Sequence, residues 1–172
     1  DELRALSEEG NAFSDLQVNL RRFERECQQL MRYMRQAAGQ QPPPVCFYDG
    51  SLAISFASQL RPRLQRRYIQ VVRALLDVSR QTRVPLIGYV ATSYASDLTS
   101  MLRWLSDEPD PPQIADAPLL RSAMAWGDRT EAFQCARQDG LFEERFQDMD
   151  YYSNLLFLYL KTTRHATPAR VE

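Results

Sequence analysis

The most informative part of this chain is the segment Val45-Cys46-Phe47-Tyr48-Asp49-Gly50-Ser51-Leu52. Four residues that favour strands lead directly into Asp49 and Gly50, so they predict a short, interior strand that ends at a carboxylate. Ligands and metal ions collect at strand ends in α/β folds. Gly50 permits a sharp turn there because it has no Cβ atom. Asp-Gly is also a common hairpin turn, so a plain turn remains an alternative.

Periodicity extends this prediction along the chain in both directions. Apolar residues at steps of three and four predict a helix over residues 12–38. Pro62 opens a second helix, about residues 62–81, and a second buried strand is expected at 84–90, beside the first in one sheet. The remaining expected elements are a helix at 97–105 with Ser96 as N-cap, a helix at 117–126 capped by Asp116, and strands at 155–160 and 169–171. The order predicts an α/β domain.

Composition restricts the class of protein. The chain has 172 residues, 44% of them hydrophobic and 25% charged, which is typical of one globular domain. It has no apolar run long enough to predict a membrane span. Its three cysteines lie far apart without CxxC spacing, which favours reduced thiols in a cytoplasmic protein over a zinc site. His165 is the only histidine, so any chemistry is expected to depend on carboxylates.

Three motifs in this order resemble one family. They are Arg25-Glu26-Cys27-Gln28-Gln29-Leu30 on the first helix, the stretch from Val45 to Leu52, and Val84-Pro85-Leu86-Ile87-Gly88-Tyr89-Val90 followed by Ser96-Asp97-Leu98. Residues 114–120 and the closing Pro168-Ala169-Arg170-Val171-Glu172 also fit. The set covers about residues 15–172 and resembles the NurA nuclease domain, the partner of the HerA translocase in DNA end processing.

The resemblance implies a ribonuclease-H-like fold, with a mixed central sheet flanked by helices. It implies a DNA nuclease dependent on Mn²⁺ or Mg²⁺, of the 5′-to-3′ exonuclease and single-strand endonuclease type, that processes double-strand breaks with a HerA-like hexameric ATPase. It also implies a homodimer in the cytoplasm.

The family's metal site uses a helical glutamate and the aspartate of an Asp-Gly-Ser-Leu motif. Asp49 matches the aspartate, and Glu26 matches the glutamate best, with Glu24 as the fallback. A further N-terminal aspartate and a C-terminal Tyr and His of the family have no counterpart, and Ala91 stands where the family often has lysine. We therefore expect residues 1–172 to form a single domain that is incomplete at both ends.

The chemistry of these two residues is consistent with that implication. Hard divalent ions prefer carboxylate oxygens, and a pair of such ions stabilises the attacking and leaving oxygens of phosphodiester cleavage. Glu26 borders the apolar seam of its helix and is expected to approach Asp49 within metal-bridging distance. The simpler alternative is that Glu26 is a solvated partner of Arg22, four residues earlier.

The second helix carries a dense set of arginines, of which Arg63, Arg66 and Arg67 are the candidate nucleic-acid contacts. A solvated helix face explains them equally well. Two further functions stay open: a non-catalytic adaptor that keeps the nuclease fold, and a phosphohydrolase with Asp49 as nucleophile. The latter ranks last because Ser51 occupies the third position of the usual Asp-x-Asp pattern, where a second aspartate is expected.

Overall fold

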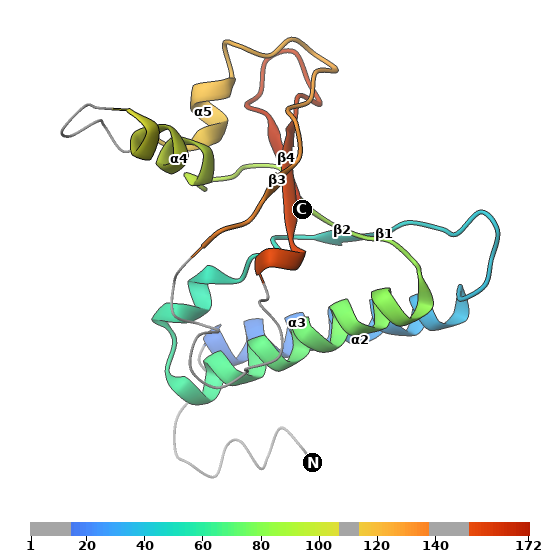
Figure 1. The fold of residues 1–172 in the computed structure, drawn as a ribbon. Helices are drawn as coiled ribbons and strands as arrows, with labels where there is room; N and C mark the ends of the chain where they lie inside the picture. Colours follow the sequence, from blue (N-terminus) through green and yellow to red (C-terminus); the bar gives the residue numbers. More distant parts are fainter. Residues whose placement is uncertain (1–14, 107–113, 138–151) are drawn as a thin grey trace. The chain divides into compact units, whose positions relative to one another are not determined.

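Two long amphipathic helices, α2 (Asp15–Gln36) and α3 (Pro62–Thr82), pack together in this computed structural model (Figure 1). The structure describes residues 15–106, 114–137 and 152–172. It divides into two units. The first comprises the described residues 15–46 and 59–85, and the second comprises residues 47–58 and the described part of 86–172.

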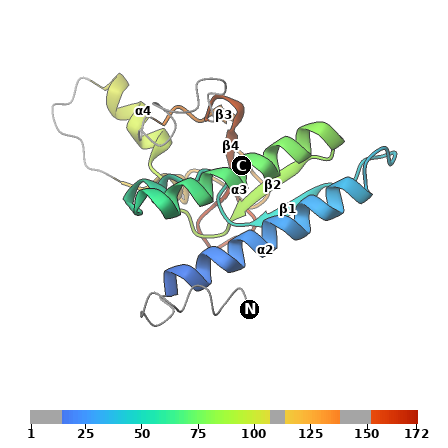
Figure 2. The same ribbon diagram turned by 90° about the horizontal axis from the view of Figure 1, so that it is seen from below.

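The apolar seam predicted from the sequence holds the first unit together. On α2 it buries Leu20, Phe23, Cys27 and Met34, and on α3 it buries Tyr68, Ile69, Val72, Leu75 and Val78. The rings of Phe23 and Tyr68 lie 4.9 Å apart between centroids. Both views show α2 and α3 side by side and running in the same direction (Figures 1 and 2).

The helix ends follow local chemistry. Pro62 occupies the first turn of α3, where its fixed φ and missing N–H do no harm. Arg83 ends α3 in the left-handed conformation, with φ of 57°. The expected boundaries of both long helices are confirmed to within three residues at the ends that the structure describes.

The second unit is built on a five-stranded mixed sheet. Cys46, the first residue of β1, is the one residue of these strands that is assigned to the first unit. Its order is β1 (Cys46–Asp49), β2 (Leu86–Val90), β5 (Ala169–Val171), β4 (Leu156–Leu160) and β3 (Phe133–Gln134). The β2–β5, β5–β4 and β4–β3 pairs are antiparallel, so the mixed character comes from β1 and β2. Tyr89 lies opposite Val171, and Leu158 lies opposite Val171 on its other side.

The prediction of a sheet that contains both early strands is confirmed, and one detail of it is wrong. Strand β1 lies at the end of the described strand order rather than in its interior, and Phe47 is 62% exposed. An apolar run of four residues does not distinguish an edge strand from a central one. The interior positions belong to β2, β5 and β4.

Short helices accompany the sheet, and all of their residues except Gln59 belong to the second unit. They are η1 (Ser55–Gln59) and η2 (Tyr152–Asn154), both 3-10 helices, with α4 (Asp97–Leu105) and α5 (Asp116–Leu120). The helix predicted at 117–126 is thus shorter than expected. Asp116 was expected to cap the helix that follows it, and this prediction is wrong because Asp116 caps a different helix. Its buried carboxylate accepts hydrogen bonds from the backbone N–H groups of Leu98 and Thr99, at 3.0 and 2.8 Å, and so caps α4.

Ser96 occupies the predicted N-cap position of α4 but makes no capping bond through its side chain. The hydroxyl of Tyr159 donates to Asp116 at 2.9 Å, which ties the start of α4 to β4. No helix in the described ranges is both long and apolar enough to span a bilayer.

Candidate active site at the Asp49 turn

Asp49 is the last residue of β1, and its side chain is exposed. No described residue pairs with its carboxylate. Gly50 follows with φ of 155°, and a Cβ atom there would lie 2.9 Å from the ring of Tyr48. The positive φ favours glycine at this position, and a larger residue would also have to displace the ring of Tyr48.

Strand β2 approaches this turn closely. A Cβ atom on Gly88 would lie 2.9 Å from the carbonyl oxygen of Gly50 and 2.9 Å from Cγ of Leu52. Because glycine carries no such atom, the chain after Asp49 can rest against β2. The glycine that interrupts the apolar pattern of the second strand thus makes room for the turn.

The carboxylate of Glu172 holds the residues that follow the turn. It accepts hydrogen bonds from the backbone N–H groups of Leu52 and Ala53, at 2.6 and 3.0 Å, and from the hydroxyl of Ser51 at 2.9 Å. The backbone of Glu172 also pairs with Gly88 in both directions, at 2.8 and 2.9 Å. Residue 172 therefore joins β2 to the segment that carries Asp49.

A row of alternating charges supports Glu172. Arg170 donates through Nε to Glu172 at 2.6 Å and through Nη1 to Asp97 at 2.5 Å. Arg137 in turn donates two hydrogen bonds to the carboxylate of Asp97, at 2.8 and 2.7 Å, and one to the hydroxyl of Ser55 at 2.7 Å. The row runs from β5 through the first residue of α4 to the segment after β3. We call these four residues, Glu172, Arg170, Asp97 and Arg137, the charge row.

Burial makes the charge row sensitive to the loss of any member. The Arg170 side chain is 1% exposed, and its guanidinium carbon lies 4.0 Å from the ring centre of Phe157. Burial alone would raise the pKa of Asp97, but bonds and charges from Arg137 and Arg170 outweigh it and hold that pKa below its ordinary value. Burial alone would lower the pKa of Arg170, but Glu172 and Asp97 raise it. Both groups are therefore charged over the physiological range.

The two carboxylates predicted on α2 have different surroundings. Glu26 is exposed and lies 3.6 Å from Arg22, four residues earlier. Glu24 is buried and receives Arg21 at 3.2 Å and Arg67 at 2.5 Å, so its charge is already balanced. Glu26 has the more accessible oxygens. It belongs to the first unit and Asp49 to the second, so their predicted proximity stays a prediction.

Carboxylate oxygens suit Mg²⁺ and Mn²⁺, and the exposed side chains of Asp49 and Glu26 supply such oxygens. The part of the chain that the structure describes contains no group of three or more His, Cys, Asp or Glu residues arranged to hold a metal ion. The carboxylates of Asp49 and Glu26 fit a divalent ion by their chemistry, and each residue would supply one carboxylate to it.

The three predicted nucleic-acid contacts on α3 also differ from one another. Arg67 is half-buried against Glu24 and helps hold α3 to α2. Arg66 is exposed and donates through Nε to the carbonyl of Pro62 at 3.2 Å. Arg63 is exposed and has no partner among the described residues.

Sequence reasoning did not find the charge row. One signal was present in the chain, because Arg170 lies within the short strand β5 and Glu172 directly follows its last residue, Val171. Opposite charges on the two sides of an apolar strand residue suggest that one face meets a polar partner.

Comparison with known proteins identifies the family. The family model described as the NurA domain matches residues 2–172. No curated protein and no solved structure matches the chain. The NurA domain family is one of nucleases associated with DNA end processing. This chain belongs to the NurA domain family.

Proposed function

We propose that this protein is a DNA nuclease that depends on Mn²⁺ or Mg²⁺, and that Asp49 is a carboxylate of its metal site. The observation that carries the proposal is the exposed Asp49 at the end of β1, on a turn braced by Glu172, in a chain of the NurA domain family. Glu26 is proposed as a second carboxylate, with Glu24 as the fallback.

The residues have distinct parts in this proposal. A divalent ion at the site would stabilise the negative charge that develops as the phosphodiester bond breaks. Asp49 would hold the ion, and the turn that Gly50 permits would present its carboxylate to solvent and substrate. Ser51, Leu52 and Ala53 would keep that carboxylate in place through their bonds to Glu172. A fixed carboxylate matters because catalysis is sensitive to displacements of about 1 Å.

Finer features of the proposal come from the family. We propose a ribonuclease-H-like arrangement of the sheet, a homodimer, and a HerA-like hexameric ATPase as partner in the processing of double-strand breaks. We also propose 5′-to-3′ exonuclease and single-strand endonuclease activities. The three free thiols accord with the cytoplasm, which keeps cysteines reduced.

Replacement of Asp49 tests the proposed site. Asp49→Asn keeps the shape of the side chain and removes the charge that binds the ion, so Mn²⁺-dependent cleavage of DNA should fall by at least about a hundredfold. Asp77→Asn is the matched control, because Asp77 is an α3 residue paired with Arg80 at 2.8 Å, outside the proposed site. Cleavage is measured on labelled DNA over a range of Mn²⁺ concentrations.

Two results would reject this proposal. Robust cleavage by Asp49→Asn would remove Asp49 from the site. Failure of the full-length protein to cleave DNA with any divalent ion, while it still binds a HerA-like ATPase, would instead favour the non-catalytic adaptor.

A further inference from the structure

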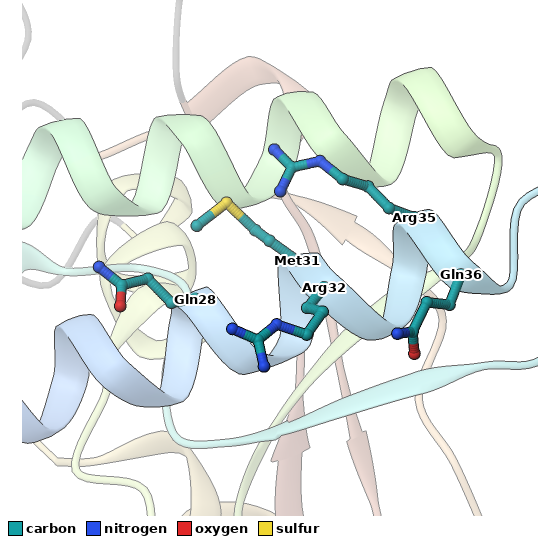
Figure 3. Close-up of a pocket in the computed structure, with 5 residues that line it drawn as sticks. All are labelled: Gln28, Met31, Arg32, Arg35 and Gln36. Carbon is teal, nitrogen blue, oxygen red and sulfur yellow. The ribbon is translucent and has the colours of Figure 1, made fainter.

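One face of α2 presents a stripe of long polar side chains. It consists of Arg25, Gln28, Arg32, Arg35 and Gln36, which are all exposed, and we call it the α2 stripe. A surface hollow of about 450 Å³ lies along it and is lined by four of these residues and by Met31. In Figure 3, Met31 and Arg35 point toward α3, and the other labelled side chains lie along α2.

The arginines of this stripe are free among the described residues. Arg25, Arg32 and Arg35 make no hydrogen bond or ion pair there. Their neighbours on the same helix are engaged, since Arg21 pairs with Glu24 and Arg22 pairs with Glu26. Three exposed guanidinium groups on one helix face, with no described protein group paired to them, are suited to an anionic partner.

The rest of the first unit adds to this positive charge. Its described residues include twelve arginines and four acidic residues. Three of the four acids, Glu24, Glu26 and Asp77, are already paired with arginines. The described part of the second unit has seven basic and six acidic residues, so the positive excess is concentrated in the first unit.

We propose that the α2 stripe binds the phosphate backbone of DNA, which extends the DNA-binding surface beyond the arginines of α3. This rests on the proposed nuclease function. Ten residues of helix separate Arg25 from Arg35, a rise of about 15 Å. That span corresponds to about four phosphate-to-phosphate steps of one strand, at about 3.4 Å of duplex axis each. The glutamine amides provide further donors to phosphate oxygens, and the contacts carry no sequence preference.

Charge also argues against self-association through this face. A two-fold dimer contact places the same surface patch on both partners, so guanidinium groups would face guanidinium groups. A phosphate backbone offers the opposite charge. The occupant that complements the stripe is therefore DNA.

Salt-dependent binding tests the inference. The double variant Arg32→Gln/Arg35→Gln removes two charges and keeps helix-forming side chains, so the slope of log affinity against log salt should flatten by about 2 for duplex DNA. Arg80→Gln/Arg83→Gln removes equal charge from the end of α3 and should leave the slope within about 0.5 of the unaltered protein. Binding of a labelled short duplex is followed by fluorescence anisotropy in EDTA, between about 50 and 200 mM salt.

The outcomes separate this inference from the proposed function. If the unaltered protein cleaves DNA and both double variants keep its slope, the α2 stripe does not contact DNA and only this inference fails. If the stripe variant instead loses a dimer or an acidic protein partner at an unchanged slope, the occupant is that protein and the inference is overturned. If the unaltered protein neither binds nor cleaves DNA, the proposed function itself fails. An equal fall of slope in both double variants would indicate diffuse charge and overturn the assignment to this stripe.

Discussion

The arginines of the charge row and those of the α2 stripe have the same chemistry and opposite surroundings. Arg170 is 1% exposed and bonded to two carboxylates, whereas Arg32 and Arg35 are exposed and free of described partners. A buried, paired guanidinium fixes the backbone around it, and an exposed, unpaired one is available to bind. The difference teaches that arginine content alone does not locate a DNA surface. The pairing of each arginine does.

The same distinction divides α2 and α3. Arg67 was a candidate for DNA binding, but its ion pair with the buried Glu24 gives it a part in holding the two helices together. Arg63 keeps the freedom that a phosphate contact needs. The prediction that Arg63, Arg66 and Arg67 bind nucleic acid remains untested, and the three are unequal candidates.

Loss of a buried, paired arginine should cost far more stability than loss of an exposed one. Arg170→Met should lower the free energy of unfolding by about 3–5 kcal/mol, because it leaves the buried Glu172 carboxylate without its cation. Arg32→Met, on the exposed stripe, should change it by less than about 0.5 kcal/mol. Urea denaturation followed by circular dichroism measures both. Equal losses of unfolding free energy in the two variants would show that burial and pairing do not determine how much each arginine contributes to stability.

The next effect links the charge row to catalysis. Glu172→Gln should reduce kcat for DNA cleavage by about tenfold to a hundredfold and leave KM nearly unchanged, because the turn that carries Asp49 loses its alignment. A glutamine amide has one acceptor oxygen, and its NH₂ group would oppose either Arg170 or the N–H groups of Leu52 and Ala53. Glu172 thus acts as a positioning residue.

The matched control is Glu131→Gln, which makes the same change at an exposed residue and should retain full kcat. A merely structural role for Glu172 would lower the amount of folded enzyme and leave kcat per folded molecule unchanged. Active-site titration distinguishes the two. An unchanged kcat in folded Glu172→Gln would separate the charge row from the site.

The sequence predicts local elements well and long-range partners poorly. The periodicity of residues 12–38 and the proline at residue 62 were enough to place α2 and α3, because helix faces and helix starts depend on near neighbours. The contacts of Glu172 with Leu52 and Ala53 join residues about 120 positions apart, and no local pattern encodes such a pair. Asp116 illustrates both cases, since its capping chemistry was expected but the helix that it caps begins 19 residues earlier.

The smallest effect is a pH dependence within the charge row. The pKa of Asp97 in the folded protein lies below its ordinary value of 3.8, because bonds and charges from Arg137 and Arg170 outweigh the effect of burial. The stability that Asp97 contributes is therefore fully present above about pH 4 and is lost as the pH falls through the lowered pKa. Each pKa unit by which folding lowers the pKa of Asp97 corresponds to about 1.4 kcal/mol of stability.

Asp97→Asn should consequently lose less stability than the unaltered protein when the pH falls from about 5 to about 2.5, the range in which carboxylates titrate. Asp77→Asn removes an exposed pair worth about 0–1 kcal/mol and should keep nearly the full acid dependence. Urea denaturation at several pH values measures the three slopes. Parallel curves for the unaltered protein and Asp97→Asn would mean that Asp97 is no better paired than the surface carboxylates, and the contrast between the two sets of arginines would lose its electrostatic basis.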